Sequence, residues 1–155
     1  MKKTMLKFFD RLVKDNGVND FDVIGFSYYP FWHGSLTALQ QNLDDMANRY
    51  GKEVVVAETA YGFTTDNYDM EKNHYGKAEE RRSNFAATVQ GQASGLRGVM
   101  NDLAQVPNGR GLGMFYWEPD SRSLPRRATI PSRAVSLLSI SRWNVMWRLN
   151  RRQTC

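Results

Sequence analysis

Apolar residues in the first 120 positions follow helical spacing in some segments and form short continuous runs in others. Helical spacing occurs at residues 4–14, 36–50 and about 79–103. In each segment an apolar side chain returns to the same face every three or four residues, which predicts an amphipathic helix. Ser35 is a candidate N-cap for the second helix, and Gly51 is a candidate C′ residue at its end.

Three short runs rich in β-branched and aromatic residues lie after these helices, at residues 21–29, 53–58 and 112–117. Because the runs are almost continuously apolar, they predict strands buried on both faces of a parallel sheet rather than half-exposed strands. Helices that alternate with such strands indicate an α/β fold with right-handed crossovers. Three strands cannot close a (β/α)₈ barrel of about 250 residues, so the sheet is either a small open one or part of a larger barrel.

The third helical segment is the longest, and a polar loop at residues 62–78 precedes it. Its predicted apolar stripe comprises Phe85, Val89, Ala93, Leu96, Met100 and Leu103. The loop is rich in Asn, Asp and Gly, and loops of this length in compact domains are often functional.

The charge of the chain is unevenly distributed. Residues 1–120 carry 13 Lys and Arg against 16 Asp and Glu, whereas residues 121–155 carry eight Arg and no acidic residue. We therefore predict a folded domain over residues 1–120, followed by an atypical basic tail. A shifted reading frame is our hypothesis for this tail, and a basic arm that binds nucleic acid is the lower-ranked alternative.

The composition argues against several other classes of protein. Cys155 is the only cysteine, so a disulfide framework is excluded, and His33 and His74 lack the spacing of zinc ligands. There is no run of about 18 apolar residues that would predict a membrane span. Asp10 and Arg11 interrupt the first apolar run too early for a signal peptide, so we expect no export signal within this sequence.

Each predicted strand ends in polar or aromatic side chains, and more follow it. They are Tyr28, Tyr29, Trp32 and His33 at the first strand, Glu58 and Tyr61 at the second, and Trp117 and Glu118 at the third. The carboxyl ends of parallel strands carry the active site in this class of fold. Aromatic rings stack on sugar rings, and carboxylates cleave glycosidic bonds, so the composition predicts a carbohydrate site.

Glu58 is the strongest carboxylate candidate in this set. A retaining glycosidase uses two carboxyl groups about 5–5.5 Å apart, but strand alternation points Glu118 away from the site if Trp117 points into it. A nucleophilic carboxylate needs a donor that favours its charged form, and either Tyr28 or Tyr29 can supply one. Only one of the two can face the site, and we slightly favour Tyr28. From composition alone, an ordinary strand-end carboxylate in a salt bridge is the favoured interpretation of Glu58.

The other candidates also have structural alternatives. Trp117 is either a sugar platform or a core aromatic residue, and Trp32 and His33 either line the substrate groove or pack within their loop. In the polar loop, Asp66 and Asp69 are weak candidates for calcium ligands, since calcium prefers oxygen donors. A solvated loop without metal is the favoured interpretation, and we expect no cofactor.

Three motifs in the predicted strands carry a family resemblance. Residues 22–34 read DVIGFSYYPFWHG, residues 54–61 read VVVAETAY, and residues 113–119 read GMFYWEP. In this order they resemble the last three strands of glycoside hydrolase family 53, the arabinogalactan endo-β-1,4-galactanases. The resemblance implies strands six, seven and eight of a (β/α)₈ TIM barrel, with Glu58 as the catalytic nucleophile and Trp117 beneath the sugar.

The resemblance also implies a substrate and a missing partner group. Family members hydrolyse internal β-1,4-galactosidic bonds of arabinogalactan or pectic galactan with retention, and they are secreted or periplasmic. Their acid/base Glu lies in an Asn-Glu pair at the end of strand four, and this sequence contains no such pair. We therefore expect little or no activity from this chain alone. The missing strands lie on another chain or are lost, and a non-catalytic carbohydrate-binding or assembly module is the alternative.

Overall fold

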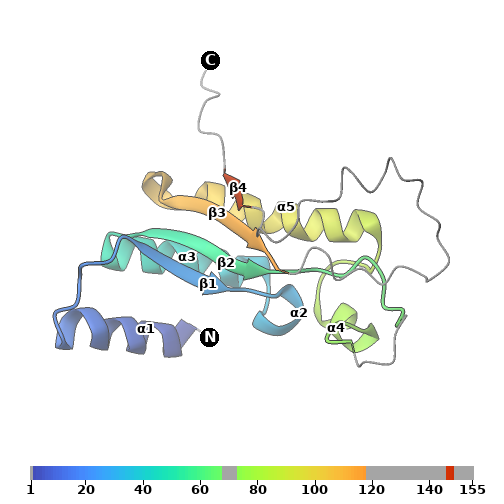
Figure 1. The fold of residues 1–155 in the computed structure, drawn as a ribbon, viewed down its shortest axis with the longest axis horizontal. Coiled ribbons are helices and arrows are strands. Elements are labelled where there is room, and N and C mark those ends of the chain that lie inside the picture. The colour runs from blue at the N-terminus through green and yellow to red at the C-terminus, as the bar shows by residue number, and fades with distance from the viewer. Residues whose placement is uncertain (1, 68–72, 118–145, 149–155) are drawn as a thin grey trace, which may run out of the picture.

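The computed structural model describes residues 2–67, 73–117 and 146–148 (Figure 1). Its strands are β1 (Val23–Ser27), β2 (Glu53–Thr59), β3 (Gly111–Tyr116) and β4 (Met146–Arg148). Its helices are α1 (Lys2–Asp10), α2 (Pro30–His33), α3 (Leu36–Tyr50), α4 (Lys77–Arg82) and α5 (Val89–Gln105). A π-helical turn, Arg11–Asp15, extends α1, and a 3₁₀ turn, Pro107–Gly109, follows α5.

The strands form one four-stranded sheet in the order β1-β2-β3-β4. Strands β1, β2 and β3 are mutually parallel, which confirms the three predicted parallel strands and their intervening helices. The sequence does not predict β4, which pairs antiparallel with β3. Apart from β4, residues 118–155 lie outside the described part of the chain, so the predicted boundary at 120 and the proposed frame shift stay predictions.

One face of the sheet shares a hydrophobic core with α1, α3 and α5. The sheet contributes Ile24, Phe26, Val54, Val56 and Met114, and the helices contribute Leu39, Leu43, Met46, Val99 and Leu103. The packing of α5 on β3 is close enough that a Cβ at Gly111 would lie 1.8 Å from the Leu103 carbonyl oxygen. Glycine is required there because any side chain would overlap this backbone oxygen.

The opposite face of the sheet is uncovered by the described elements. Strand β1 alternates between exposed and buried residues, and Val23 is 39% exposed. The prediction of strands buried on both faces is therefore wrong for this chain. A parallel strand needs packing on both sides to be buried on both, and the described helices that share the core pack on only one side.

Both predicted ends of α3 are confirmed. The Ser35 side chain accepts a hydrogen bond from the Ala38 amide at 3.2 Å, and Gly51 is left-handed with φ 66°. Helix α1 packs beside α3, where the Arg49 guanidinium donates to the Asp10 carboxylate at 2.9 Å. Met5, Leu6 and Phe9 of α1 pack against the core, and this ion pair lies at the exposed edge of that contact.

The predicted third helix is interrupted, which corrects the single helix expected over residues 79–103. Helix α4 ends at Arg82 and α5 starts at Val89, with Thr88 accepting a hydrogen bond from the Gly91 amide as its N-cap. The Ala87 amide donates to the Glu80 side chain at 2.7 Å. Side chains therefore satisfy the backbone between the helices, which removes the need for helical hydrogen bonds there.

The interruption also changes the buried face of α5. Val89, placed in the stripe by its sequence spacing, is 72% exposed. The buried residues of this helix are Gly95, Val99 and Leu103. Phe85 precedes the helix and packs on Gly95, where a Cβ would lie 3.3 Å from its ring. Within the described ranges, no helix is long and apolar enough to cross a membrane.

Candidate active site

The carboxyl ends of β1, β2 and β3 meet at one edge of the sheet, where α2 and α4 also lie (Figure 1). The Tyr28 amide donates to the Glu58 carbonyl oxygen at 2.8 Å, and the Trp117 amide donates to the Thr59 carbonyl oxygen at 2.8 Å. These bonds continue the parallel pairing past the ends of β1 and β3. The candidate residues of all three strands are thereby brought to the same edge.

Glu58 follows an irregularity in the pairing of β1 with β2. Phe26 pairs with Val56, whereas the next residue, Ser27, pairs with Glu58, so Ala57 is an extra residue in β2. A bulge of this kind turns the side chains that follow it and is common beside active sites. The Glu58 side chain is half-buried, and its Oε1 accepts a hydrogen bond from the Tyr29 hydroxyl.

Tyr29, not Tyr28, is the tyrosine that contacts Glu58, which corrects the preference drawn from the sequence. The Tyr28 hydroxyl donates instead to the Gly34 carbonyl oxygen at 2.8 Å, and its side chain is fully buried. Burial, and secondly the negative charge of Asp102, raises the pKa of Tyr28. Tyr28 therefore remains a neutral donor within the fold, and its burial disagrees with the expected contact to substrate.

His33 lies at the end of α2, and its Nδ1 accepts a hydrogen bond from the Tyr29 amide at 2.9 Å. Burial lowers the pKa of His33, which favours the neutral ring that this bond requires. Trp32 is 48% exposed, and its ring lies 6.2 Å from that of His74. The structure thus leaves Trp32 accessible for stacking on a sugar, whereas His33 is engaged with its own turn.

Tyr61 is buried in an aromatic cluster with Tyr29, Phe31, Tyr75 and Phe85. Its hydroxyl bonds to the Ser83 hydroxyl, and it donates to the Phe85 carbonyl oxygen at 2.5 Å. The side chain therefore connects β2 to the segment between α4 and α5, and its burial disagrees with the predicted role in substrate binding.

Gln92 is a residue of this region that sequence reasoning missed. Its side-chain amide donates to the Tyr61 carbonyl oxygen at 2.6 Å and to the Tyr116 hydroxyl at 3.2 Å. The Tyr116 hydroxyl donates to the same carbonyl oxygen at 3.1 Å. Nothing in the local pattern around Gln92 indicates these contacts, because its partners lie on β3 and beyond the end of β2.

Trp117 is 42% exposed directly after β3, which is accessible enough for a sugar platform. Its partner in the motif, Glu118, lies outside the described residues, as does Asp69 of the calcium hypothesis. Asp66 accepts a hydrogen bond from the Thr64 hydroxyl at 2.9 Å. Among residues that the structure describes, no group of three His, Cys, Asp or Glu side chains is arranged to hold a metal ion.

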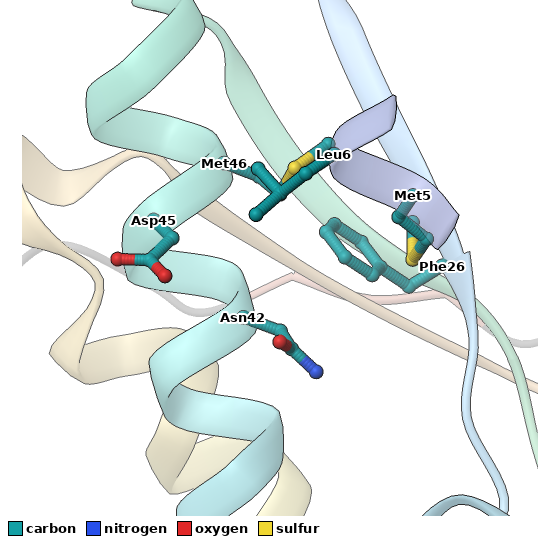
Figure 2. A pocket seen from close by; sticks show the side chains of 6 residues that line it. All are labelled: Met5, Leu6, Phe26, Asn42, Asp45 and Met46. Carbon is teal, nitrogen blue, oxygen red and sulfur yellow. The ribbon is translucent and has the colours of Figure 1, made fainter. Parts of the chain in front are cut away.

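A separate pocket lies between α1 and α3, on the helix-covered face of the sheet. Figure 2 shows its lining residues, Met5 and Leu6 from α1, Phe26 from β1, and Asn42, Asp45 and Met46 from α3. Phe26 belongs to the hydrophobic core, and Met5 and Leu6 pack against that core. The pocket is therefore a gap in the packing of the two helices, and it contains none of the candidate site residues.

The sequence profile described as glycosyl hydrolase family 53 matches residues 1–141. This chain belongs to that family. The match includes all three parallel strands, and it continues into the basic segment after residue 120. The parallel strands and their helices are accordingly part of a (β/α)₈ barrel, as the resemblance implied.

Two curated family 53 relatives illustrate the similarity. The chain is 46% identical over 100 residues to an endo-beta-1,4-galactanase of Bacillus subtilis, a match that covers 64% of this chain and 23% of the relative. It is 39% identical over 107 residues to an arabinogalactan endo-beta-1,4-galactanase of Cellvibrio japonicus, covering 68% and 27%. The chain therefore spans about a quarter of the length of these relatives.

A solved structure shows the same relationship in three dimensions. The Ignisphaera aggregans GH53 catalytic domain superposes with a TM-score of 0.69 at 38% sequence identity. The superposition covers 75% of this chain and 32% of that domain. The superposed part of this chain thus corresponds to about a third of that catalytic domain.

Proposed function

We propose that this chain supplies the nucleophile end of a retaining endo-β-1,4-galactanase. The observation that carries the proposal is the contact between the Tyr29 hydroxyl and the Glu58 carboxylate at the carboxyl ends of two parallel strands. The phenol orients the carboxylate through this hydrogen bond, and a carboxylate at this position is the kind of group that attacks in a retaining glycosidase. Trp32 and Trp117 are 48% and 42% exposed, so their rings are accessible to a sugar.

In the proposed mechanism the Glu58 carboxylate attacks the anomeric carbon, and the bond from that carbon to the leaving oxygen breaks. The product is a covalent glycosyl-enzyme, which water then hydrolyses with net retention. The acid/base carboxyl protonates the leaving oxygen and later deprotonates the water. We expect that group to come from a strand of the barrel that is not among these 155 residues.

The proposed substrate is the β-1,4-galactan backbone of arabinogalactan, in line with the names of the two relatives, or of pectic galactan, as the family resemblance implies. Exposed tryptophans at two strand ends suit a chain of sugar rings that runs across the edge of the sheet. A polysaccharide of this size does not enter cells, so we expect the complete enzyme to act outside the cytoplasm. Since the chemistry needs only two carboxyl groups, we expect EDTA to leave turnover unchanged.

The test combines this chain with a second polypeptide that carries the first five βα units of a family 53 barrel. Neither polypeptide alone should cleave galactan, whereas the mixture should release oligosaccharides. Glu58→Gln should lower turnover by about a thousandfold or more, since nucleophile removal blocks the first step. Glu53→Gln is the matched control, because Glu53 is exposed at the other end of β2.

Two results would contradict the proposal. Full turnover by the Glu58→Gln mixture would remove Glu58 from the mechanism. Galactan binding by the chain without any cleavage by the mixture would favour the alternative of a non-catalytic carbohydrate-binding module.

A further inference from the structure

The segment that joins β1 to α3 contains the short helix α2 and is closed by hydrogen bonds between its own residues. The Tyr28 hydroxyl donates to the Gly34 carbonyl oxygen at 2.8 Å, and the Tyr29 amide donates to His33 Nδ1 at 2.9 Å. The His33 amide in turn donates to the Tyr29 carbonyl oxygen at 2.9 Å. Gly34 has φ 94°, a conformation that favours glycine, and it directs the chain out of the turn.

His33 thus contacts both backbone polar groups of Tyr29, and the Trp32 amide also donates to the Tyr29 carbonyl oxygen at 3.0 Å. The Tyr29 residue is buried, so its amide needs a partner within the protein. Since the Tyr29 side chain reaches across to Glu58 on the neighbouring strand, the direction of its Cα–Cβ bond decides whether the hydroxyl meets the carboxylate. A rotation of the backbone at this residue would move the hydroxyl away.

We propose that His33 is a positioning residue, whose Nδ1 holds the Tyr29 amide so that the Tyr29 hydroxyl meets Glu58. His33 acts through Tyr29 and needs no contact with substrate. The proposal deepens, and rests on, the proposed role of Glu58 as nucleophile. It assigns His33 to the support of the site instead of to the substrate groove.

The main rival is a packing role for the imidazole ring. The ring of His33 lies 6.4 Å from that of Tyr28, 5.9 Å from Tyr29 and 6.4 Å from Trp32. Packing depends on the shape of the ring, whereas positioning depends on an acceptor atom at the Nδ1 position. Substitutions that keep one property and remove the other therefore separate the two roles.

Three variants of the whole 155-residue chain make this separation. His33→Asn keeps an acceptor oxygen at the position of Nδ1 but has no ring. His33→Gln moves its acceptor one carbon further along the side chain, and His33→Phe keeps a ring without any acceptor. If His33→Phe fails to fold, the comparison of the Asn and Gln variants still decides the question.

Nuclear magnetic resonance measures both bonds directly. The first readout is hydrogen exchange of the Tyr29 amide, and the second is the hydroxyl proton signal of Tyr29, assigned by its loss in Tyr29→Phe. We expect His33→Asn to keep both. We expect His33→Phe and His33→Gln to lose the hydroxyl signal and to exchange the amide about tenfold faster. Methyl signals of Leu43 and Val54 in the core serve as the folding control.

Retention of both readouts in His33→Phe, or in His33→Gln, would overturn the proposal. Loss of both in a folded His33→Asn would also overturn it, in favour of packing. Neither readout involves substrate or turnover. A negative result here would therefore be distinct from a failure of the proposed galactanase function.

Discussion

At the scale of single residues, the adjacent tyrosines Tyr28 and Tyr29 have different roles. The Tyr28 hydroxyl bonds to the backbone of Gly34, and the Tyr29 hydroxyl bonds to the Glu58 carboxylate. The division follows from strand alternation, which directs neighbouring side chains to opposite faces. Tyr28 stabilises the turn after β1, and Tyr29 forms a hydrogen bond with the candidate nucleophile, Glu58.

Replacing each tyrosine with phenylalanine should separate these tasks. Tyr28→Phe removes the hydrogen bond from the buried Tyr28 side chain to the Gly34 carbonyl oxygen, so we expect the free energy of unfolding to fall by about 0.5–1.5 kcal/mol. Tyr29→Phe should leave the turn after β1 intact, because the Tyr29 hydroxyl bonds to Glu58 and not to the turn. Urea unfolding of both variants measures the difference, and an unchanged midpoint for Tyr28→Phe would count against this assignment.

The sequence predicted that only one tyrosine would face the carboxylate, but it predicted the wrong one. Alternation is a local rule, and Glu58 lies beyond an extra residue, Ala57, in β2. The bulge is a property of the pairing between β1 and β2. The pattern of residues along one strand does not reveal this pairing. Glu58 is visible locally as a carboxylate at the end of an apolar run, but its role as nucleophile is what the family resemblance implies.

At the scale of elements, α5 places the Asp102 carboxylate near Asp44 of α3. Asp102 of α5 is half-buried, and its Oδ2 has no hydrogen-bond partner among the described residues. Burial, and secondly the negative charge of Asp44 on α3, raises the pKa of Asp102 to about 6. At neutral pH the folded state therefore holds a charge that burial disfavours.

The sign of the resulting pH dependence follows from the raised pKa. The folded state binds a proton more tightly than the unfolded state, so Asp102 contributes stability at acidic pH that is lost as the pH rises through about 6. We expect Asp102→Asn to stabilise the chain at pH 8 by about 1 kcal/mol, after allowance for solvent screening. The gain should fade toward pH 4.

Thermal unfolding of wild type and Asp102→Asn across this pH range is the measurement. Asp20→Asn, at an exposed position outside the helices, is the control and should show no comparable gain at pH 8. A destabilised Asp102→Asn at pH 8 would show that the charged form makes a favourable contact in this interface.

Most elements were predictable from spacing, whereas the break between α4 and α5 was not. The ends of α3 were marked by Ser35 and Gly51, whose cap chemistry is local. The break depends on Tyr61, which reaches Phe85 from the segment after β2, and on Glu80, whose side chain occupies the Ala87 amide. Side-chain hydrogen bonds thus replace helical backbone bonds in residues 83–88, although the sequence pattern there is compatible with a helix.

At the scale of the whole molecule, the sheet has a covered face and an uncovered one. Ile24 faces the core with α3 and α5, and Val23 lies on the other face. In a closed barrel the uncovered face would line the interior, where side chains of alternate strands pack in layers. The apolar character of β1 therefore suits a complete barrel better than this part of one.

Threonine substitutions on the two faces should differ sharply in this chain. Ile24→Thr places a hydroxyl in the core and removes buried carbon atoms, so we expect a loss of about 2–3 kcal/mol. Val23→Thr should change the free energy of unfolding by less than about 0.5 kcal/mol, as is usual at exposed sites. Urea unfolding measures both, and equal losses would show that the second face is covered in solution.

The contact between Tyr29 and Glu58 also bears on the order of folding during synthesis. The two residues are 29 positions apart; Tyr29 follows β1, and Glu58 belongs to the next strand, β2. A nascent chain that has emerged as far as β2 already contains both partners, together with the turn around His33. We therefore expect the surroundings of the candidate nucleophile Glu58 to assemble co-translationally, before β3 leaves the ribosome.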